Sequence, residues 1–141
     1  MPYEVHGIDN RHPEVGSGLI GELAEPAYEK PFLQFVKKAM KVGVIRHTRL
    51  RSRKIGTVAL CGGAGGFLLG RAKAAGADIF ITADYKYHEF FDADGEILIA
   101  DIGHYESEQY TVELLSSIIS TNFRTFADNS TEVNTNPVKY T

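Results

Sequence analysis

The chain has 141 residues, of which 43% are hydrophobic and 23% are charged, values typical of a globular domain. Its one cysteine, Cys61, excludes an internal disulfide, so a reducing, cytoplasmic location is expected. No apolar stretch is long enough to cross a membrane and the first residues lack a signal-peptide pattern, so we expect no membrane partner. The net charge of -3 argues against nucleic acid as a partner.

The first third of the chain contains three different segments. Residues 7–25 are rich in glycine and proline, which predicts extended backbone and turns. Residues 32–40 place apolar side chains on one helical face, which predicts an amphipathic helix. Residues 46–54 hold a third of all lysines and arginines, which indicates a solvated loop or edge strand, or alternatively a contact for phosphate groups.

From residue 54 onward, short apolar runs alternate with helical patterns. The runs are residues 57–60, 78–82 and 96–100, and the helical patterns are residues 67–75, 85–93 and 104–120. This alternation predicts a single α/β domain over residues 1–141, with a mostly parallel sheet and helices on both faces. A further strand near Phe123 and a frayed polar tail should follow.

Polar side chains follow each predicted strand, at residues 61–66, 82–88 and 101–108. Ligands of parallel sheets bind outside the carboxyl ends of the strands, so these three exits should share one crevice. The glycine-rich exit at 61–66 could offer backbone N–H groups to an anion, although close packing of strand against helix explains its glycines equally well.

The third exit is the most informative for chemistry. His104 and Glu108 are four residues apart, and they extend an apolar stripe formed by Val112, Leu115 and Ile119, so both should point into the protein. An imidazole and a carboxylate buried together suit a divalent cation. The alternative is that Glu108 only forms a hydrogen bond with His104 and orients it.

Two side chains of the second exit are candidates for general acid or base catalysis. Asp84 and His88 follow a strand, again four residues apart, and either could move a proton near a metal. His88 could equally be an ordinary helix histidine among aromatic residues. Asp101, at the end of its strand, is a candidate for a helix cap or for support of the metal ligands.

Four stretches, in this order, resemble one known family: residues 16–23, 58–65, 76–88 and 101–108. The family is that of the GTP cyclohydrolase I type two homologues, the Nif-three-like proteins. The resemblance runs from about residue 7 to the end of the chain and includes Asn134 to Tyr140. Several motifs in the family's order make a chance match a poor explanation.

The resemblance implies a bilobed α/β protein that assembles into a toroidal homohexamer. Two divalent metal ions, of zinc, iron or manganese, lie between its halves, and the Gly-His-Tyr-x-x-Glu motif assigns His104 and Glu108 as metal ligands. The chain resembles the carboxyl-terminal half, so we expect it to be part of a longer protein. Its own site would then be half built, with metal weakly held or absent. The resemblance also suggests that the tail is an ordered last strand.

Together these features predict a dinuclear metal-dependent hydrolase that acts on a small anionic substrate, a nucleotide or phosphoester. In this hypothesis His104 and Glu108 hold metal, and His88 or Asp84 assists proton transfer. The GTP ring opening that the family's name implies is not carried over to this chain. The alternative is a non-enzymatic module that binds metal or nucleotide and interacts with a partner.

Overall fold

The computed structural model describes residues 16–125, 127 and 129–141. Its sheet has five strands in the order β1-β3-β4-β5-β2. Their bounds are β1 Leu19–Tyr28, β2 Arg46–His47, β3 Lys54–Ala64, β4 Ile79–Ala83 and β5 Leu98–Asp101. The three central strands are parallel, and β1 and β2 pair antiparallel at the two edges. The predicted mostly parallel sheet is confirmed.

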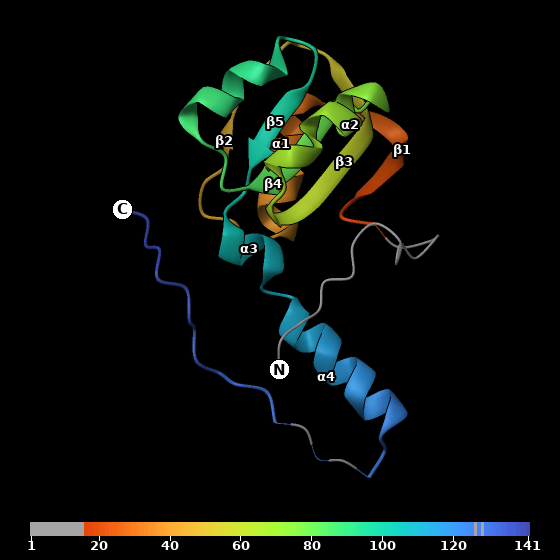
Figure 1. The fold of residues 1–141 in the computed structure, drawn as a ribbon, viewed down its shortest axis with the longest axis vertical. Helices are drawn as coiled ribbons and strands as arrows, with labels where there is room; N and C mark the ends of the chain where they lie inside the picture. Colours follow the sequence, from red (N-terminus) through yellow and green to blue (C-terminus); the bar gives the residue numbers. More distant parts are fainter. Residues whose placement is uncertain (1–15, 126, 128) are drawn as a thin grey trace.

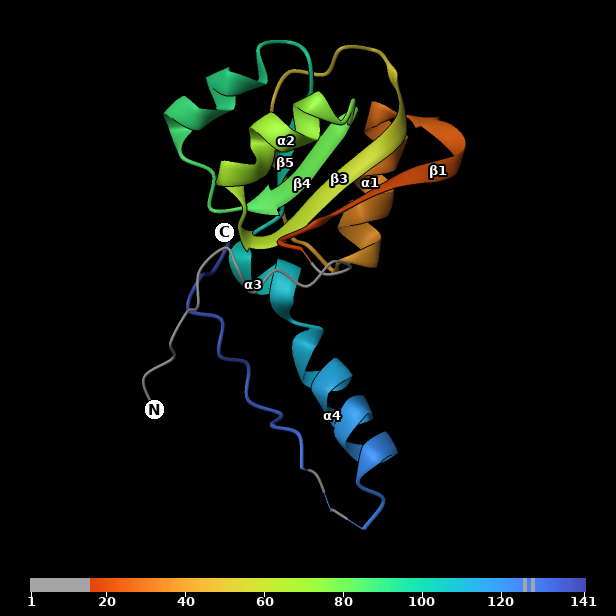
Figure 2. The same ribbon diagram turned by 45° about the vertical axis from the view of Figure 1, so that its right-hand side comes forward.

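Helices cover both faces of this sheet, as the alternating pattern predicted. The helices are α1 Glu29–Ala39, α2 Leu69–Ala74, α3 His104–Glu108 and α4 Thr111–Asn122, and the 3-10 helices are η2 Gly66–Leu68 and η3 Tyr87–Ala93. Helix α1 lies on one face of the sheet and α2 on the other, while α3 sits at the carboxyl ends of the parallel strands (Figures 1 and 2). The predicted α/β class is therefore confirmed.

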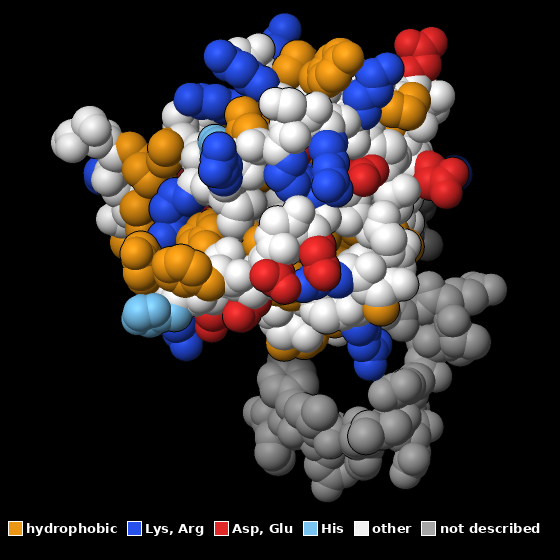
Figure 3. All heavy atoms as spheres, turned by 90° about the horizontal axis from the view of Figure 1, so that it is seen from above, with side chains coloured by type: hydrophobic (Ala, Val, Ile, Leu, Met, Phe, Trp, Pro, Cys, Tyr) orange, Lys and Arg blue, Asp and Glu red, His pale blue; other side chains and the backbone are white. Residues whose placement is uncertain are grey.

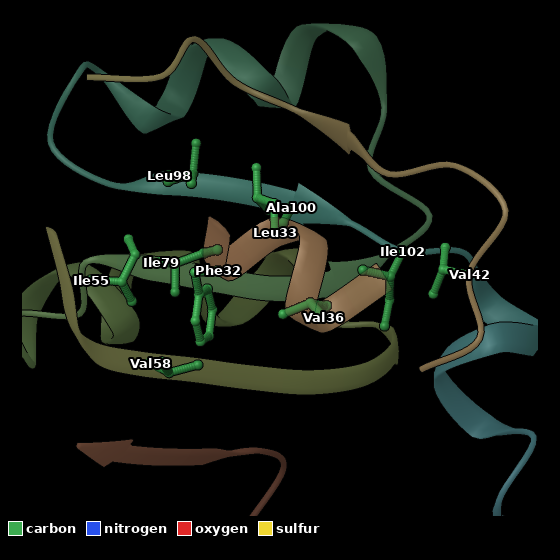
Figure 4. Packing of buried hydrophobic residues seen from close by; sticks show 10 residues of the cluster. All are labelled: Phe32, Leu33, Val36, Val42, Ile55, Val58, Ile79, Leu98, Ala100 and Ile102. Carbon is green, nitrogen blue, oxygen red and sulfur yellow. The ribbon is translucent and has the colours of Figure 1, made fainter. Parts of the chain in front are cut away.

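Two apolar cores, one on each face, hold the layers together. On one face Phe32 and Val36 of α1 pack against strand residues that include Ile79 (Figure 4). On the other face Phe80 packs in a cluster with Leu69 of α2. Successive side chains of a strand point to opposite faces, so both Ile79 and Phe80 are buried. This double burial explains why the central strands read as continuous apolar runs.

The basic segment at residues 46–54 contains the short edge strand β2 followed by a loop. Lysine and arginine side chains gather among hydrophobic ones at this end of the molecule (Figure 3). One arginine serves the fold: the Nε atom of Arg51 lies 3.0 Å from Oε1 of buried Glu29, and its Nη2 donates to the carbonyl oxygen of Asp78 at 2.8 Å. The expectation of an edge strand or loop is borne out here.

The predicted long helix at 104–120 is two helices. The Gln109 side chain donates to the carbonyl oxygen of Met40 at 2.8 Å, and the Tyr110 hydroxyl donates to that of Ala39 at 2.9 Å. These bonds hold the break between the helices against the end of α1, and α4 then runs away from the sheet (Figure 2). The stripe that was expected to be buried is exposed, with Val112 at 45% and Leu115 at 52%.

The carboxyl-terminal predictions also need correction. Phe123 is exposed and follows α4, donating its N–H to the carbonyl oxygen of Ile119, in place of the predicted strand. Residues 129–141 contain no strand, so the suggestion of an ordered last strand is not confirmed. The tail instead contacts α3 through Asn136, whose Nδ2 lies 3.3 Å from Oε1 of Glu106.

The amino-terminal segment is described only in part. Residues 7–15 of the stretch predicted as extended lie outside the described residues, and β1 accounts for most of the remainder. No helix in the described part of the chain is long and apolar enough to cross a membrane.

Candidate functional site

The three polar exits lie together at the carboxyl ends of β3, β4 and β5. A groove of about 950 Å³ runs beside α3, lined by Asp84, His104 and Glu108 and by tail residues from 130 to 140. Because β3, β4 and β5 are parallel neighbours, their ends meet at one edge of the sheet, where α3 begins (Figure 1).

His104 is the centre of this group. Its Nδ1 lies 2.6 Å from Oδ2 of Asp84, and its Nε2 lies 3.4 Å from Oε2 of Glu108. All three side chains are about half exposed, at 52%, 51% and 52% respectively. The expectation that His104 and Glu108 point into the protein interior is wrong, since the apolar stripe that they were to extend is not covered.

The two carboxylates change the proton affinity of His104. The hydrogen bond that His104 donates to the Asp84 carboxylate raises the pKa of His104 above its ordinary value of 6.5, and the negative charges of Asp84 and Glu108 act in the same direction. Partial desolvation opposes them, and the net pKa shift is upward. The site therefore favours a positive charge on or beside the imidazole.

Gly63 makes room for this arrangement at the end of β3. Its φ of +63° suits glycine, and a Cβ there would lie 2.6 Å from Oε1 of Glu108 and 3.3 Å from Cε1 of His104. Its N–H donates to Oγ of Ser107 at 2.9 Å. Strand and helix can approach this closely because residue 63 has no side chain.

The rest of the glycine-rich exit also serves packing. The N–H of Gly65 donates to Oγ1 of Thr82 at 3.0 Å, and a Cβ at Gly65 would lie 2.9 Å from Sγ of Cys61. The amides of Gly63 and Gly65 are thus used within the protein. The close-packing interpretation of these two glycines fits the structure better than an anion site.

Buried Asp101 lies beneath the group. Its carboxylate accepts the N–H of Tyr85 and the N–H of Gly103, each at 3.0 Å, and forms an ion pair with Arg46. The sequence pointed to Asp101 as a support or a cap, but it gave no reason to join Arg46 to it. The one sequence feature that could have indicated the pair is the positive charge of Arg46, the first residue of the basic segment.

His88 lies apart from the group. It is exposed on η3, with its ring 5.2 Å from that of Tyr87. Within the described ranges, no hydrogen bond or ion pair joins His88 to Asp84, His104 or Glu108. Its role in proton transfer stays a prediction.

Glu106 is a buried carboxylate that the sequence reasoning did not single out. It contacts Asn136 of the tail, and the nearby Tyr140 has its pKa raised first by desolvation and then by the charges of Glu106 and Asp101. Glu106 lies in the same motif as His104, but helical spacing places it on another face of α3.

The donor set suits a cation that has further ligands. No group of three or more His, Cys, Asp or Glu residues within the described chain surrounds one point in a way that could hold a metal ion. At His104, Asp84 takes one ring nitrogen and Glu108 faces the other. One imidazole nitrogen and one carboxylate therefore remain for a metal.

Comparisons with known proteins agree on one family. Residues 3–137 match the family model Duf34/NIF3 (NGG1p interacting factor 3). A Staphylococcus epidermidis protein named GTP cyclohydrolase 1 type 2 homolog is 32% identical over 147 residues, which cover 99% of this chain and 40% of that protein. A Bacillus subtilis protein of the same name is 31% identical over 106 residues, covering 74% of this chain and 28% of that protein.

Solved structures give the same result. A crystal structure of a Bacillus cereus protein related to NIF3 has a TM-score of 0.76 and 28% identity, covering 89% of this chain and 36% of that one. A Staphylococcus aureus protein also has a TM-score of 0.76, with 25% identity and coverage of 88% and 42%. The chain spans about 40% of the length of the Staphylococcus epidermidis relative. On this evidence, the chain belongs to the Duf34/NIF3 (NGG1p interacting factor 3) family.

Proposed function

We propose that the groove beside α3 is one side of a divalent-metal centre in a hydrolase that acts on a nucleotide or phosphoester. This chain would contribute His104 through Nε2 and Glu108 through its carboxylate. The observation that carries the proposal is that these two donors face each other at 3.4 Å while the other ring nitrogen is engaged. The ligands that complete the centre, for two ions of zinc, iron or manganese, would come from outside the described residues.

Asp84 makes His104 a competent donor. A carboxylate 2.6 Å from Nδ1 holds the ring proton on that nitrogen, which leaves the Nε2 lone pair directed at the Glu108 side. Histidine ligands of metals usually have such a partner, because it fixes both the ring orientation and the tautomer. Asp84 therefore acts on His104 in this proposal, and it can also accept a proton during hydrolysis.

A bound divalent cation supplies Lewis-acid activation of water and of the substrate oxygen. The remaining tasks fall to side chains of this chain. Asp84 orients the imidazole, Glu108 supplies negative charge, and Gly63 keeps the space beside both open. His88 would assist proton transfer only if substrate binding brings it toward the groove.

The proposal is tested first by metal titration of the purified chain. Because further ligands complete the centre, we expect zinc or manganese to bind weakly in isothermal titration calorimetry, and His104→Ala to lower that affinity at least about tenfold. The matched control is His47→Ala, which removes another exposed imidazole that lies on β2, away from the groove. Equal metal affinity of the wild type and of His104→Ala would contradict the proposal.

Hydrolysis is tested separately on the metal-loaded protein. Candidate substrates are GTP, since two relatives carry a cyclohydrolase name, and a chromogenic phosphodiester. We expect His104→Ala to abolish turnover while the variant stays folded by circular dichroism. A His88→Ala variant that loses turnover but keeps metal affinity would assign proton transfer to His88.

A second candidate function is a non-enzymatic module that binds metal and a partner protein, for example further copies in a homohexamer. The observation that favours it is the row of exposed apolar side chains on α4, including Leu114, Leu115 and Ile118. Metal binding without turnover of any substrate tested, together with self-association of the chain, would favour this function.

A further inference from the structure

Asp101 contacts the two turns that carry Asp84 and His104, the partners of the central hydrogen bond of the groove. Its Oδ2 accepts the N–H of Tyr85 at 3.0 Å, and its Oδ1 accepts the N–H of Gly103 at 3.0 Å. Tyr85 follows Asp84 in the chain and Gly103 precedes His104. One buried carboxylate thus binds the backbone beside each partner of the 2.6 Å Asp84–His104 hydrogen bond.

Arg46 completes this arrangement from the neighbouring edge strand. Arg46 and Asp101 are directly paired across β2 and β5, and their side chains form an ion pair. The same guanidinium donates to the carbonyl oxygen of Tyr85 at 2.8 Å and lies over the ring of Phe90. The backbone of Tyr85 is therefore held on both sides, through its N–H by Asp101 and through its carbonyl by Arg46.

The turn at Asp84 has a less common backbone conformation. Asp84 has a φ of +55°, in the left-handed region that few residues other than glycine, asparagine and aspartate adopt. Asp94 has a similar φ of +50°, and its N–H donates to the carbonyl oxygen of Phe91 in an ordinary turn after η3. The two aspartates form an internal comparison, because the carboxylate of Asp101 reaches the residue after Asp84 and not the turn at Asp94.

We propose that Asp101, with Arg46, is a positioning residue that fixes Asp84 against His104 and thereby directs Nε2 of His104 toward Glu108. It acts through two backbone amides. The consequence for metal affinity rests on the proposed function, but the consequence for the Asp84–His104 geometry does not.

The test is Asp101→Asn, which keeps the shape of the side chain but replaces one acceptor oxygen with a donor. Hydrogen exchange of the Tyr85 and Gly103 amides and the imidazole 15N shifts of His104 are read by NMR on the metal-free chain. The remaining oxygen can accept from one turn only, so we expect exchange at the other amide, that of Tyr85 or of Gly103, to accelerate at least about tenfold and the His104 tautomer preference to weaken. Zinc affinity should fall by about 10–100-fold, as for other residues that orient metal ligands.

Two further variants keep the result decisive. Arg46→Gln removes the ion pair and the hydrogen bond to the Tyr85 carbonyl. Because Arg46 lies at an exposed edge position, this variant should fold, and it should change the amide exchange and the imidazole shifts less than Asp101→Asn does. If Asp101→Asn does not fold, Arg46→Gln provides the test. Asp94→Asn is the control and should change none of them. Wild-type exchange and imidazole shifts in the folded Asp101 and Arg46 variants would overturn the proposal.

The two proposals fail in different ways. If the wild-type chain binds no zinc, the proposed metal centre fails for this chain, while amide exchange and imidazole shifts still decide on the positioning role. If zinc binds but neither folded variant changes the NMR signals, only the positioning role fails. An equal effect of Asp94→Asn would also overturn it, because that residue lies in a turn that Asp101 does not reach.

Discussion

The substitution Gly63→Ala tests how closely β3 must approach α3. The new Cβ would lie 2.6 Å from Oε1 of Glu108 and 3.3 Å from Cε1 of His104, in a backbone conformation with φ of +63°. The left-handed conformation costs a residue with a Cβ roughly 1–2 kcal/mol. The Glu108 carboxylate is the far end of a flexible side chain, so it can rotate away at little cost in stability. The stability loss should therefore come mainly from the backbone.

We expect Gly63→Ala to lower the free energy of unfolding by about 1–2 kcal/mol, which corresponds to a fall of roughly 3–6 °C in Tm for a domain of this size. Metal affinity should fall in addition, by about tenfold, because Glu108 is displaced from the Nε2 side of His104. Thermal unfolding followed by circular dichroism and zinc titration measure the two effects independently.

The matched control is Gly70→Ala in α2. No atom lies within 4 Å of the Cβ that this change would add, and its φ is not in the left-handed region. Because alanine is the better helix former, this variant should be more stable by about 0.5–1 kcal/mol and should bind metal as the wild type does. A Gly63→Ala protein with wild-type Tm and wild-type zinc affinity would refute the geometry described for β3 and α3.

Three further changes test other parts of the structure. NMR titration should show the pKa of His104 above 6.5, and Asp84→Asn should lower that pKa. An unchanged pKa in the variant would contradict the hydrogen bond. The small contribution of this pair to stability is present below pH 6.5 and is lost as the pH rises through the folded-state pKa of His104. Arg51→Ala removes the guanidinium beside Glu29, which is only 2% exposed and would keep just the backbone N–H groups of residues 51 and 52 as donors. Urea unfolding should then show a loss of about 3 kcal/mol, and a loss under about 1 kcal/mol would contradict a buried pair. Leu115→Ser on α4 should change stability by less than about 0.5 kcal/mol but reduce self-association in light scattering, whereas a large loss of stability would mean that α4 packs within its own chain.

The central strands were predictable because burial on both faces leaves a direct trace in composition. The apolar runs at 57–60, 78–82 and 96–100 became β3, β4 and β5. The extension of β3 to Ala64 was not predictable, since glycines normally signal a turn. In the structure the pairing of β3 with β4 shifts between Leu60 and Ala64, and the glycines lie in that irregular stretch.

The break between α3 and α4 had no trace in hydrophobic periodicity. The positions that continue the face of His104 are apolar through Ile119, so the pattern favoured one buried helix. The direction of the chain is set instead by two long-range bonds, from Gln109 and Tyr110 to the end of α1. Periodicity shows which face of a helix is apolar, but it does not show what covers that face.

The site was partly predictable, because one part of it depends only on local helix geometry. The four-residue spacing correctly placed His104 and Glu108 on one face of α3, since it depends only on helix geometry. The contact with Asp84 depends on a left-handed turn, and the Arg46–Asp101 pair depends on which strand forms the sheet edge. Both are consequences of the tertiary fold. The sequence had marked Arg46 only as part of a basic segment, and Asp84 and Asp101 only as residues that follow predicted strands.

The charges around the groove set an order of binding for the proposed hydrolase. Among the residues that the structure describes, six carboxylates line it against a single guanidinium, that of Arg46, which is already paired with Asp101. The carboxylates are those of Asp84, Asp101, Glu106, Glu108, Glu113 and Glu132. Without a cation, this surface disfavours a phosphate group, so for the proposed hydrolase we expect an anionic substrate to bind more tightly once metal is bound. If a nucleotide binds to the metal-free chain, we expect it to use a different surface, for example the groove between residues 46–52 and 87–97, which includes Arg49 and the exposed ring of Phe91. The hydrolase hypothesis thus requires that metal and substrate binding be coupled, whereas the binding-module hypothesis does not.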